Sequence, residues 1–257
     1  MFDGGFSLSR GAVSRQLAAM PARTYFIRLI HFQTRRPFPG ERLWTASQIM
    51  DESTLRFLRA RNREGFDIYF RPHADHQNAG YILVDLDEAP PAVLAEMRAN
   101  GHEPCVAVET SPGHFQAWIR VSNKPVAPAL ATQIARHLAH LYHGDRASAD
   151  WRHVGRLAGF TNQKPQRRLP SGLPPWVRLR TARPCLASNR GALVDAASRP
   201  TPPPAIRGKI RSSIATPPPD SIHDDAFDPA AAVAIYQTWL TDLQIYSWQA
   251  YCDPWSE

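Results

Sequence analysis

One short apolar segment constrains the fold of this chain more than any other. Residues 81–84 read Tyr-Ile-Leu-Val, and Asp85 and Asp87 follow directly. A continuous apolar run of this length is typical of a strand that is buried on both faces, here the central strand of a sheet. Because side chains alternate along a strand, Asp85 and Asp87 should project from one face and Leu86 from the other. We therefore expect a buried strand that ends in a pair of carboxylates.

Predicted strands and helices alternate around this segment. Stretches rich in β-branched and aromatic residues predict strands at 24–31, 66–71, 105–109, 115–121 and 176–180. Apolar periodicity and capping signals predict helices at 7–20, 45–61, 91–100 and 127–143, the second with a break at 51–54. This order, with one hairpin between the middle strands, indicates an α/β or α+β domain with a mixed sheet.

Local signals place several of these boundaries. Thr45 and Gln48 spell a capping box, in which Thr45 caps a helix and Gln48 reaches back to it. Pro72 should end the strand that begins near residue 66, because proline cannot donate a backbone hydrogen bond. Pro91 and Gly101 should bracket the next helix, since proline suits the first helical position and glycine suits the position after the last.

The character of the chain changes after the last predicted strand. We expect residues 1–181 to form the main domain and residues 182–222 to form an extended or disordered linker, because prolines dominate a stretch with little apolar content. Residues 223–257 should form a short helical segment, with Asp228 as its N-cap and Pro229 in its first turn.

The charge balance favours an anionic partner. The 257 residues include 30 Lys and Arg against 23 Asp and Glu, a net charge of +7. From Trp151 to Val194 there is no acidic residue, whereas the basic residues there are Arg152, Arg156, Lys164, Arg167, Arg168, Arg178, Arg180, Arg183 and Arg190. Such a one-signed stretch suits contact with a phosphate backbone. A solvated basic loop would have the same composition.

Other features of the composition exclude several classes of protein. With 43% hydrophobic residues, the chain has the composition of a globular protein. Its first residues lack the pattern of a secretory signal, and no stretch is apolar for long enough to span a membrane. The three cysteines lie far apart and predict neither a disulfide framework nor a zinc site. We expect a cytoplasmic location.

Asp85 and Asp87 are the first candidate functional residues. Two carboxylates on one strand face can share hard cations, as in many nucleotidyl transferases that hold Mg²⁺. An acidic pair in a solvated turn is the plain alternative. Ser111 and His114 lie in the predicted hairpin turn, where a hydroxyl, backbone N–H groups and an imidazole would suit a triphosphate. A surface histidine without a function is the alternative there.

Asp150 begins a third candidate motif. It precedes a glycine-spaced basic run, so it suits a third metal ligand followed by phosphate-binding side chains. The candidates for nucleotide binding in this run are Arg152, Arg156, Asn162 and Lys164. Candidates for contacts with DNA follow at Arg167, Arg168 and Arg178. A basic turn that binds nothing is the alternative.

In this order, the motifs resemble the archaeo-eukaryotic primase superfamily and, within it, the RepB-type primases of plasmids. The superfamily pattern is an apolar strand that ends in Asp-x-Asp, a turn of the Ser-x-His type and a later single Asp. The matching segments are 68–72, 83–85, 108–112, 116–118, 147–150, 152–153 and 155–162. Together they cover about residues 8–180. In the RepB-type pattern the two aspartates are adjacent, whereas Leu86 separates them here.

The resemblance implies a recognition-motif-like sheet with a flanking α/β unit. It implies that Asp85, Asp87 and Asp150 bind Mg²⁺ or Mn²⁺ and carry the synthesis of short primers from nucleoside triphosphates on single-stranded DNA. A replicative helicase or an origin-binding protein would be a further partner. The larger helical C-terminal domain of the family is matched at most by the run from Asp228.

Two other functions fit the same residues. A non-catalytic module could bind single-stranded DNA on the same sheet through arginines and aromatic stacking. A primase-polymerase would extend primers as well as start them. The three carboxylates favour an enzyme, because acidic side chains at a DNA surface would oppose binding unless a metal were present.

Overall fold

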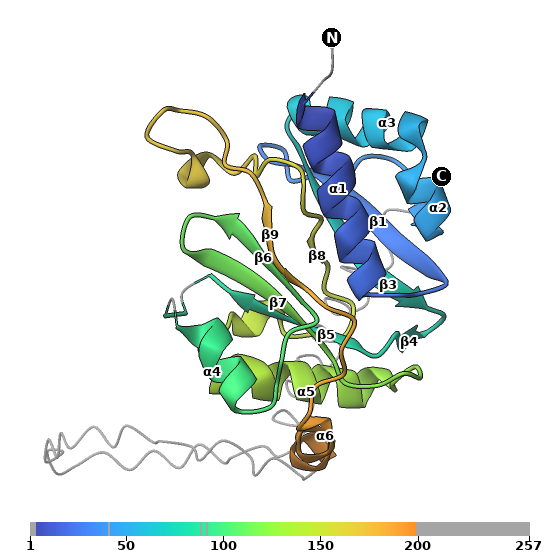
Figure 1. The fold of residues 1–257 in the computed structure, drawn as a ribbon, viewed down its shortest axis with the longest axis vertical. Coiled ribbons are helices and arrows are strands. Elements are labelled where there is room, and N and C mark those ends of the chain that lie inside the picture. The colour runs from blue at the N-terminus through green and yellow to red at the C-terminus, as the bar shows by residue number, and fades with distance from the viewer. Residues whose placement is uncertain (1–3, 41, 88, 91, 199–257) are drawn as a thin grey trace, which may run out of the picture. The chain divides into compact units, whose positions relative to one another are not determined.

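The computed structural model describes residues 4–40, 42–87, 89–90 and 92–198 (Figure 1). Its helices are α1 (Gly4–Ala19), α2 (Ala46–Met50), α3 (Glu52–Arg63), α4 (Val93–Ala99), α5 (Pro128–Leu141), η1 (Arg146–Ser148), η2 (Pro165–Arg167) and α6 (Arg190–Ser198). Its strands are β1 (Thr24–His31), β2 (Arg42–Trp44), β3 (Phe66–Ala74), β4 (Gln77–Asn78), β5 (Tyr81–Leu86), β6 (Val106–Ser111), β7 (His114–Arg120), β8 (Gly155–Arg156) and β9 (Arg178–Ala182). None of the described helices is both long and apolar enough to cross a membrane.

The described strands form two sheets. The first sheet has the order β2-β1-β3-β4, with β8 also paired to β3, and the second has the order β5-β7-β6-β9. Every pairing among these strands is antiparallel, so the expectation of a mixed sheet was wrong. The α+β class itself is confirmed. Hairpins and short helices connect the strands and reverse the direction of the chain, so neighbouring strands run antiparallel.

Strand β5 is buried, although it lies at the end of its sheet. The expectation of a central strand was therefore wrong. Its apolar run arises because both faces of the strand are covered. Tyr81 and Leu83 enter one hydrophobic core, and Ile82, Val84 and Leu86 enter another. Asp85 shares the face of Tyr81 and Leu83, which is the face toward the first core.

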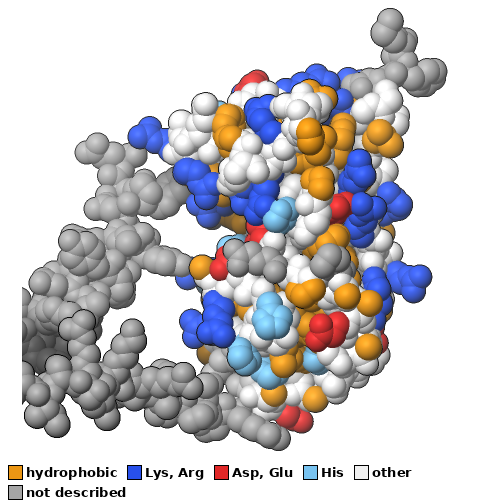
Figure 2. All heavy atoms as spheres, turned by 90° about the vertical axis from the view of Figure 1, so that its left-hand side faces the viewer, with side chains coloured by type: hydrophobic (Ala, Val, Ile, Leu, Met, Phe, Trp, Pro, Cys, Tyr) orange, Lys and Arg blue, Asp and Glu red, His pale blue; other side chains and the backbone are white. Residues whose placement is uncertain are grey.

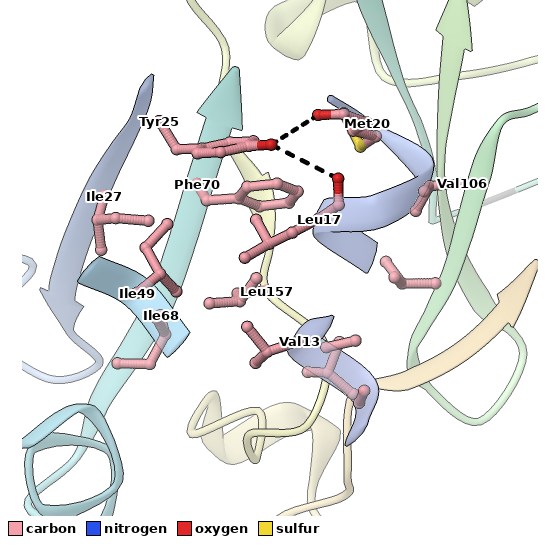
Figure 3. Packing of buried hydrophobic residues seen from close by; sticks show 14 of the residues in the cluster. Val13, Leu17, Met20, Tyr25, Ile27, Ile49, Ile68, Phe70, Val106 and Leu157 are labelled. Carbon is pink, nitrogen blue, oxygen red and sulfur yellow. Dashed lines mark hydrogen bonds between the residues drawn. The ribbon is translucent and has the colours of Figure 1, made fainter. Parts of the chain in front are cut away.

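The first core lies between α1 and the two sheets (Figure 3). Val13 and Leu17 of α1 pack there with Phe70 of β3 and Val106 of β6. The Tyr25 hydroxyl donates a 2.9 Å hydrogen bond to the Met20 carbonyl, so this buried polar group is satisfied. The second core lies on the other face of the second sheet, where α4, α5 and α6 cover it (Figure 1).

The capping box is confirmed. The Thr45 hydroxyl accepts from the Gln48 N–H at 3.2 Å, and the Gln48 side chain accepts from the Thr45 N–H at 2.9 Å. The helical run divides at Asp51, as expected, and the Asp51 carboxylate caps α3 through the Ser53 N–H at 2.9 Å. Local hydrogen bonding is therefore sufficient to set these helix boundaries.

Several boundaries differ from expectation by a few residues, and two of the differences have a local cause. Strand β3 continues through Pro72 to Ala74. On one side of β3, β8 pairs with Tyr69 and Phe70, and β4 pairs with the strand only from residue 73 onward. Pro72 therefore has no described strand partner on that side. The backbone N–H that proline lacks is not needed there, so the strand continues at little cost. Helix α4 begins at Val93 and not at residue 91, because the Val93 N–H closes a turn onto the Pro90 carbonyl.

The packed domain extends beyond the predicted boundary at residue 181. That residue lies within β9, and α6 follows and packs against α5. Leu193 and Ala197 of α6 are buried in the second core. The boundary was therefore placed too early, because the prolines that suggested a linker are concentrated after α6. The remainder of the predicted linker and the predicted helix from Asp228 lie outside the described residues.

Leu86→Asp tests the two-faced burial of β5. Leu86 is 0% exposed, so a carboxylate there should lower the free energy of unfolding by more than about 3 kcal/mol. The matched control is Leu8→Asp, because Leu8 is 67% exposed on α1 and its replacement should change stability by only about 0.5 kcal/mol. Urea unfolding measures both variants, and equal midpoints would contradict this account of the strand.

Candidate active site

A cavity of about 310 Å³ opens where the two sheets meet. Both sheets and the loops around them contribute to its walls. Its lining is Ile30, Arg35, Tyr69, Asp85, Asp87, Thr110, Gln116, Asp145, Ser148, His153, Val154, Arg156, Asn162, Lys164 and Arg167. One wall of the cavity thus carries acidic side chains, which come from the second sheet and from the loop after α5. The facing wall carries basic side chains, which come from the first sheet and from the loop that follows β8.

Figure 2 views the molecule from the side toward which the β6–β7 turn and the loop after η2 project in Figure 1. Lys and Arg side chains gather mainly in the upper half of this face, with a few acidic side chains near its middle and histidines below. On this face, the basic side chains are therefore concentrated in one part. This distribution suits an extended anionic partner.

Asp85 is the most deeply placed carboxylate in the cavity. Its Oδ2 accepts a 3.1 Å hydrogen bond from Gln116. Its Oδ1 is buried and has no hydrogen-bond partner within the residues that the structure describes. Burial raises the pKa of Asp85, and the neighbouring Asp87 raises it further. An unsatisfied buried oxygen beside a second carboxylate is an environment that a divalent cation would neutralise.

Asp87 takes part in a contact with two side chains. Its carboxylate pairs with the Arg167 guanidinium at 3.1 Å. The Nδ1 atom of His114 donates to the Asp87 carbonyl oxygen at 2.6 Å, and the same guanidinium contacts the His114 ring. The histidine expected to grip a triphosphate therefore holds Arg167 beside the carboxylate pair.

Asp145 is a carboxylate that the sequence interpretation missed. Its backbone N–H donates to the Asp85 carbonyl at 2.9 Å, which ties the loop after α5 to the end of β5. Gly144 permits this approach, because a Cβ there would lie 2.8 Å from the same carbonyl. The Asp145 side chain accepts from Ser148 Oγ at 2.6 Å, and this bond lowers the pKa of Asp145. An aspartate two residues after the expected end of the helix at residue 143 was the available signal.

The structure does not bring Asp150 into this cavity. Asp150 lines a separate, far smaller space with Trp151, and only His153 borders both. Its carboxylate accepts from the Arg152 N–H at 2.6 Å, and the contact with His153 lowers the pKa of Asp150. The expectation that it joins Asp85 and Asp87 is therefore not met, because its turn places the Asp150 carboxylate beside the smaller space.

The carboxylates that share the cavity do not converge on one point. Asp87 is turned to Arg167 and Asp145 to Ser148. Accordingly, no three acidic, histidine or cysteine side chains in the described parts of the chain form a ready cluster for a metal ion. The residue types fit a hard cation, and the side chains of Asp87 and Asp145 would have to turn toward it.

Arg156 was expected to bind nucleotide, but its guanidinium is used inside the protein. It donates two hydrogen bonds to Asp67, at 2.6 and 2.9 Å, and the two side chains are only 3% and 4% exposed. Asp67 also accepts from the Gln163 N–H at 2.7 Å. The pair therefore fastens β8 and the following loop to β3.

Two further predicted residues lie in the cavity wall. Asn162 is buried, donates to the Thr110 carbonyl at 3.0 Å and accepts from the Lys164 N–H at 3.1 Å, so its amide holds the loop. Within the described residues, the Lys164 ammonium makes no hydrogen bond or ion pair, and burial together with Arg156 lowers the pKa of Lys164. Lys164 is thus a predicted cation in the cavity wall whose ammonium remains available to a ligand.

Residues 45–199 match the model of the RepB DNA-primase N-terminal domain. The chain belongs to this family. The resemblance inferred from the motifs is thereby confirmed.

Relatives of this RepB-type domain support the assignment. Mobilization protein A of Escherichia coli is 39% identical over 196 residues, which is 73% of this chain and 26% of that protein. The chain thus spans about a quarter of that relative. A crystal structure of the catalytic domain of primase RepB′ in complex with initiator DNA matches with a TM-score of 0.64 and 38% identity, over 74% of this chain and 93% of that one.

A more distant structure shows the same fold. The AEP domain of the cyanophage S-2L primase-polymerase matches with a TM-score of 0.53 over 73% of this chain and 97% of that one. At 15% identity this likeness concerns the fold alone. It confirms the expected primase fold for the RepB-type domain.

Near the hairpin, the RepB-type domain places a different hydroxyl in the cavity from the one predicted. Ser111 is 2% exposed and does not line the cavity, whereas Thr110 does. The β6–β7 register shifts between Glu109 and Ser111. Such an irregularity changes which side chain faces a given side of the sheet, and no feature of the sequence predicted it.

The predicted basic residues outside the cavity lie on the surface. Arg152 is exposed beside Trp151, with its guanidinium carbon 5.3 Å from a ring centroid. Arg168 is exposed and donates to the Gly172 carbonyl at 2.7 Å. Arg178 is exposed on β9. These positions are compatible with contacts to DNA.

Arg35 is a second residue that the sequence interpretation missed. It lines the cavity from the turn after β1 and has a left-handed φ of 58°. Such a conformation is uncommon for arginine and often marks a functional turn. Its position places a cation on the wall opposite the second sheet, and no local pattern in the sequence indicated it.

Asp85→Asn tests the electrostatics of the RepB-type site in the absence of metal. Burial raises the pKa of Asp85 in the folded protein, so folding favours the protonated carboxyl. The free energy of unfolding therefore falls as the pH rises through that pKa and the buried carboxyl becomes charged. With chelator at neutral pH, the variant should have a higher Tm, by roughly 2–4 °C, equivalent to about 1 kcal/mol in a domain of this size. The difference should vanish below about pH 4, where unfolded aspartates are protonated. If Asp85→Asn had a lower Tm than the unmodified protein at neutral pH, the charge on Asp85 would not be destabilising and this account would be contradicted.

Proposed function

We propose that this chain is the catalytic domain of a DNA primase of a plasmid or mobile element. It would synthesise short primers from nucleoside triphosphates on single-stranded DNA. The observation that carries the proposal is the buried Oδ1 of Asp85, which has no partner among the described residues and lies in a cavity that also holds Asp87 and Asp145. Membership of the RepB family and the likeness to a primase domain bound to initiator DNA support it.

Asp85, Asp87 and Asp145 would hold Mg²⁺ or Mn²⁺. We assign the third carboxylate to Asp145 and not to Asp150, because Asp145 lines the same cavity and its backbone is bonded to Asp85. When bound, such cations lower the pKa of an attacking hydroxyl and neutralise charge on the transferred phosphoryl group.

Basic residues of the cavity would bind the triphosphate. Lys164 has an unpaired ammonium within the described residues, and Arg35 lies on the wall of the first sheet. His114 would act through Arg167, which it contacts beside Asp87. Cations placed in this way stabilise phosphate charge without taking part in covalent chemistry.

Exposed arginines would track the template. Arg152, Arg168 and Arg178 lie outside the cavity. Each neutralised phosphate releases counterions, so binding of single-stranded DNA should weaken as salt increases. This contribution would be separate from nucleotide binding.

Asp145→Ala and Asp150→Ala distinguish the two assignments of the third carboxylate. With single-stranded DNA, labelled nucleotides and Mg²⁺ or Mn²⁺, Asp145→Ala should reduce primer synthesis by about 100-fold or more, as expected for loss of a ligand to a catalytic metal. Asp150→Ala should retain most of the activity. Circular dichroism and DNA binding provide the controls for folding.

The reverse result would restore Asp150 to the site and remove Asp145. If the unmodified chain bound single-stranded DNA but incorporated no nucleotide on any template, the primase proposal would fail in favour of a DNA-binding module.

A further inference from the structure

Gln116 joins a carboxylate of the second sheet to the backbone of the first. From β7, its Nε2 donates to Asp85 Oδ2 at 3.1 Å, while its Oε1 accepts from the Arg156 N–H at 2.8 Å. The residue is 5% exposed. One amide group therefore connects Asp85 to β8, which itself is paired with β3.

The orientation of this amide is determined by its two partners. A carboxylate oxygen accepts only, and a backbone N–H donates only. Turning the amide over would place its oxygen against Asp85 and its NH₂ group against the Arg156 N–H. Both contacts would then be repulsive, so the donor of Gln116 has to face the carboxylate.

The far end of the bridge is held rigidly. Arg156 is anchored through its side chain to Asp67, and Tyr69 and Phe70 of β3 pair with β8. Gly155 allows close packing there, because a Cβ would lie 2.8 Å from Trp118 Nε1. The position of the Gln116 donor thus follows from the first sheet as well as from its own strand.

We propose that Gln116 is a positioning residue that holds Asp85 with its unpartnered Oδ1 presented to a divalent cation. This inference rests on the proposed function. Gln116 supplies a neutral donor, so it orients the carboxylate without cancelling its charge. A lysine or arginine at the same place would compete with the cation for that charge.

Gln16 offers a matched control for this role. It is also a buried glutamine, 0% exposed, and it bonds to the same segment of chain. Its Nε2 donates to the Arg156 carbonyl at 3.3 Å, and its Oε1 accepts from the Ala158 N–H at 2.7 Å. Gln16 bonds to backbone alone, so its loss should affect folding without acting on Asp85 directly.

The experiment compares Gln116→Leu with Gln16→Leu in the full chain. Mn²⁺ alone is titrated and its binding is followed by electron paramagnetic resonance, and stability is followed by urea unfolding. We expect both variants to lose stability, and only Gln116→Leu to bind Mn²⁺ about 10–100-fold more weakly, the usual effect of removing a group that orients a metal ligand. Gln116→Met, which also lacks the donor but keeps a flexible side chain, should reproduce the weaker binding if the leucine variant does not fold.

Unchanged Mn²⁺ affinity in a folded Gln116 variant would overturn the inference and leave the proposed function intact. Equal weakening in the Gln16 and Gln116 variants would also overturn it, because the effect would then follow general destabilisation. If the unmodified chain bound no Mn²⁺, the proposed metal site and this inference would fail together.

Discussion

The buried ion pair between Asp67 and Arg156 is the interaction on which the rest of the site depends. Both side chains are almost fully buried and form two hydrogen bonds. Removing one partner of such a pair leaves an uncompensated charge at a cost of about 3–5 kcal/mol, so the two positions are strongly coupled. Asp67 also accepts from the Gln163 N–H, which places Lys164 at the cavity.

Arg156 also links the two sheets through its backbone. Arg156 lies on β8, which is paired with β3 of the first sheet, and its backbone N–H bonds to Gln116 of the second. On β5, alternation of side chains directs Asp85 to the face between the sheets and Leu86 to the opposite core. The carboxylate and the cations thus meet because each sheet contributes one wall of the cavity.

Features that depend on neighbouring residues were predictable from the sequence. The capping box at Thr45, the buried run before Asp85 and the burial of Leu86 all follow from local spacing. The family resemblance likewise rested on ordered motifs, and it is confirmed. Within this part of the chain, periodicity and capping carry most of the information about secondary structure.

Features that depend on distant partners were not predictable. Asp145 and Asp150 lie five positions apart in the segment after α5, and the bond from the Asp145 N–H to the carbonyl of Asp85, a residue 60 positions away, holds Asp145 at the cavity. Arg156 resembled a ligand-binding cation because its partner Asp67 is 89 residues away. The edge position of β5 also depends on the pairing of the whole sheet, which a single strand does not encode.

The most direct test of the central claim, that the cavity between the sheets binds divalent cations, is anomalous diffraction from crystals soaked in Mn²⁺. The account predicts an anomalous peak within reach of Asp85, Asp87 and Asp145, with Asp85 Oδ1 among the ligands. A peak at Asp150 and His153 with none in the cavity, or no peak at full soaking, would contradict it.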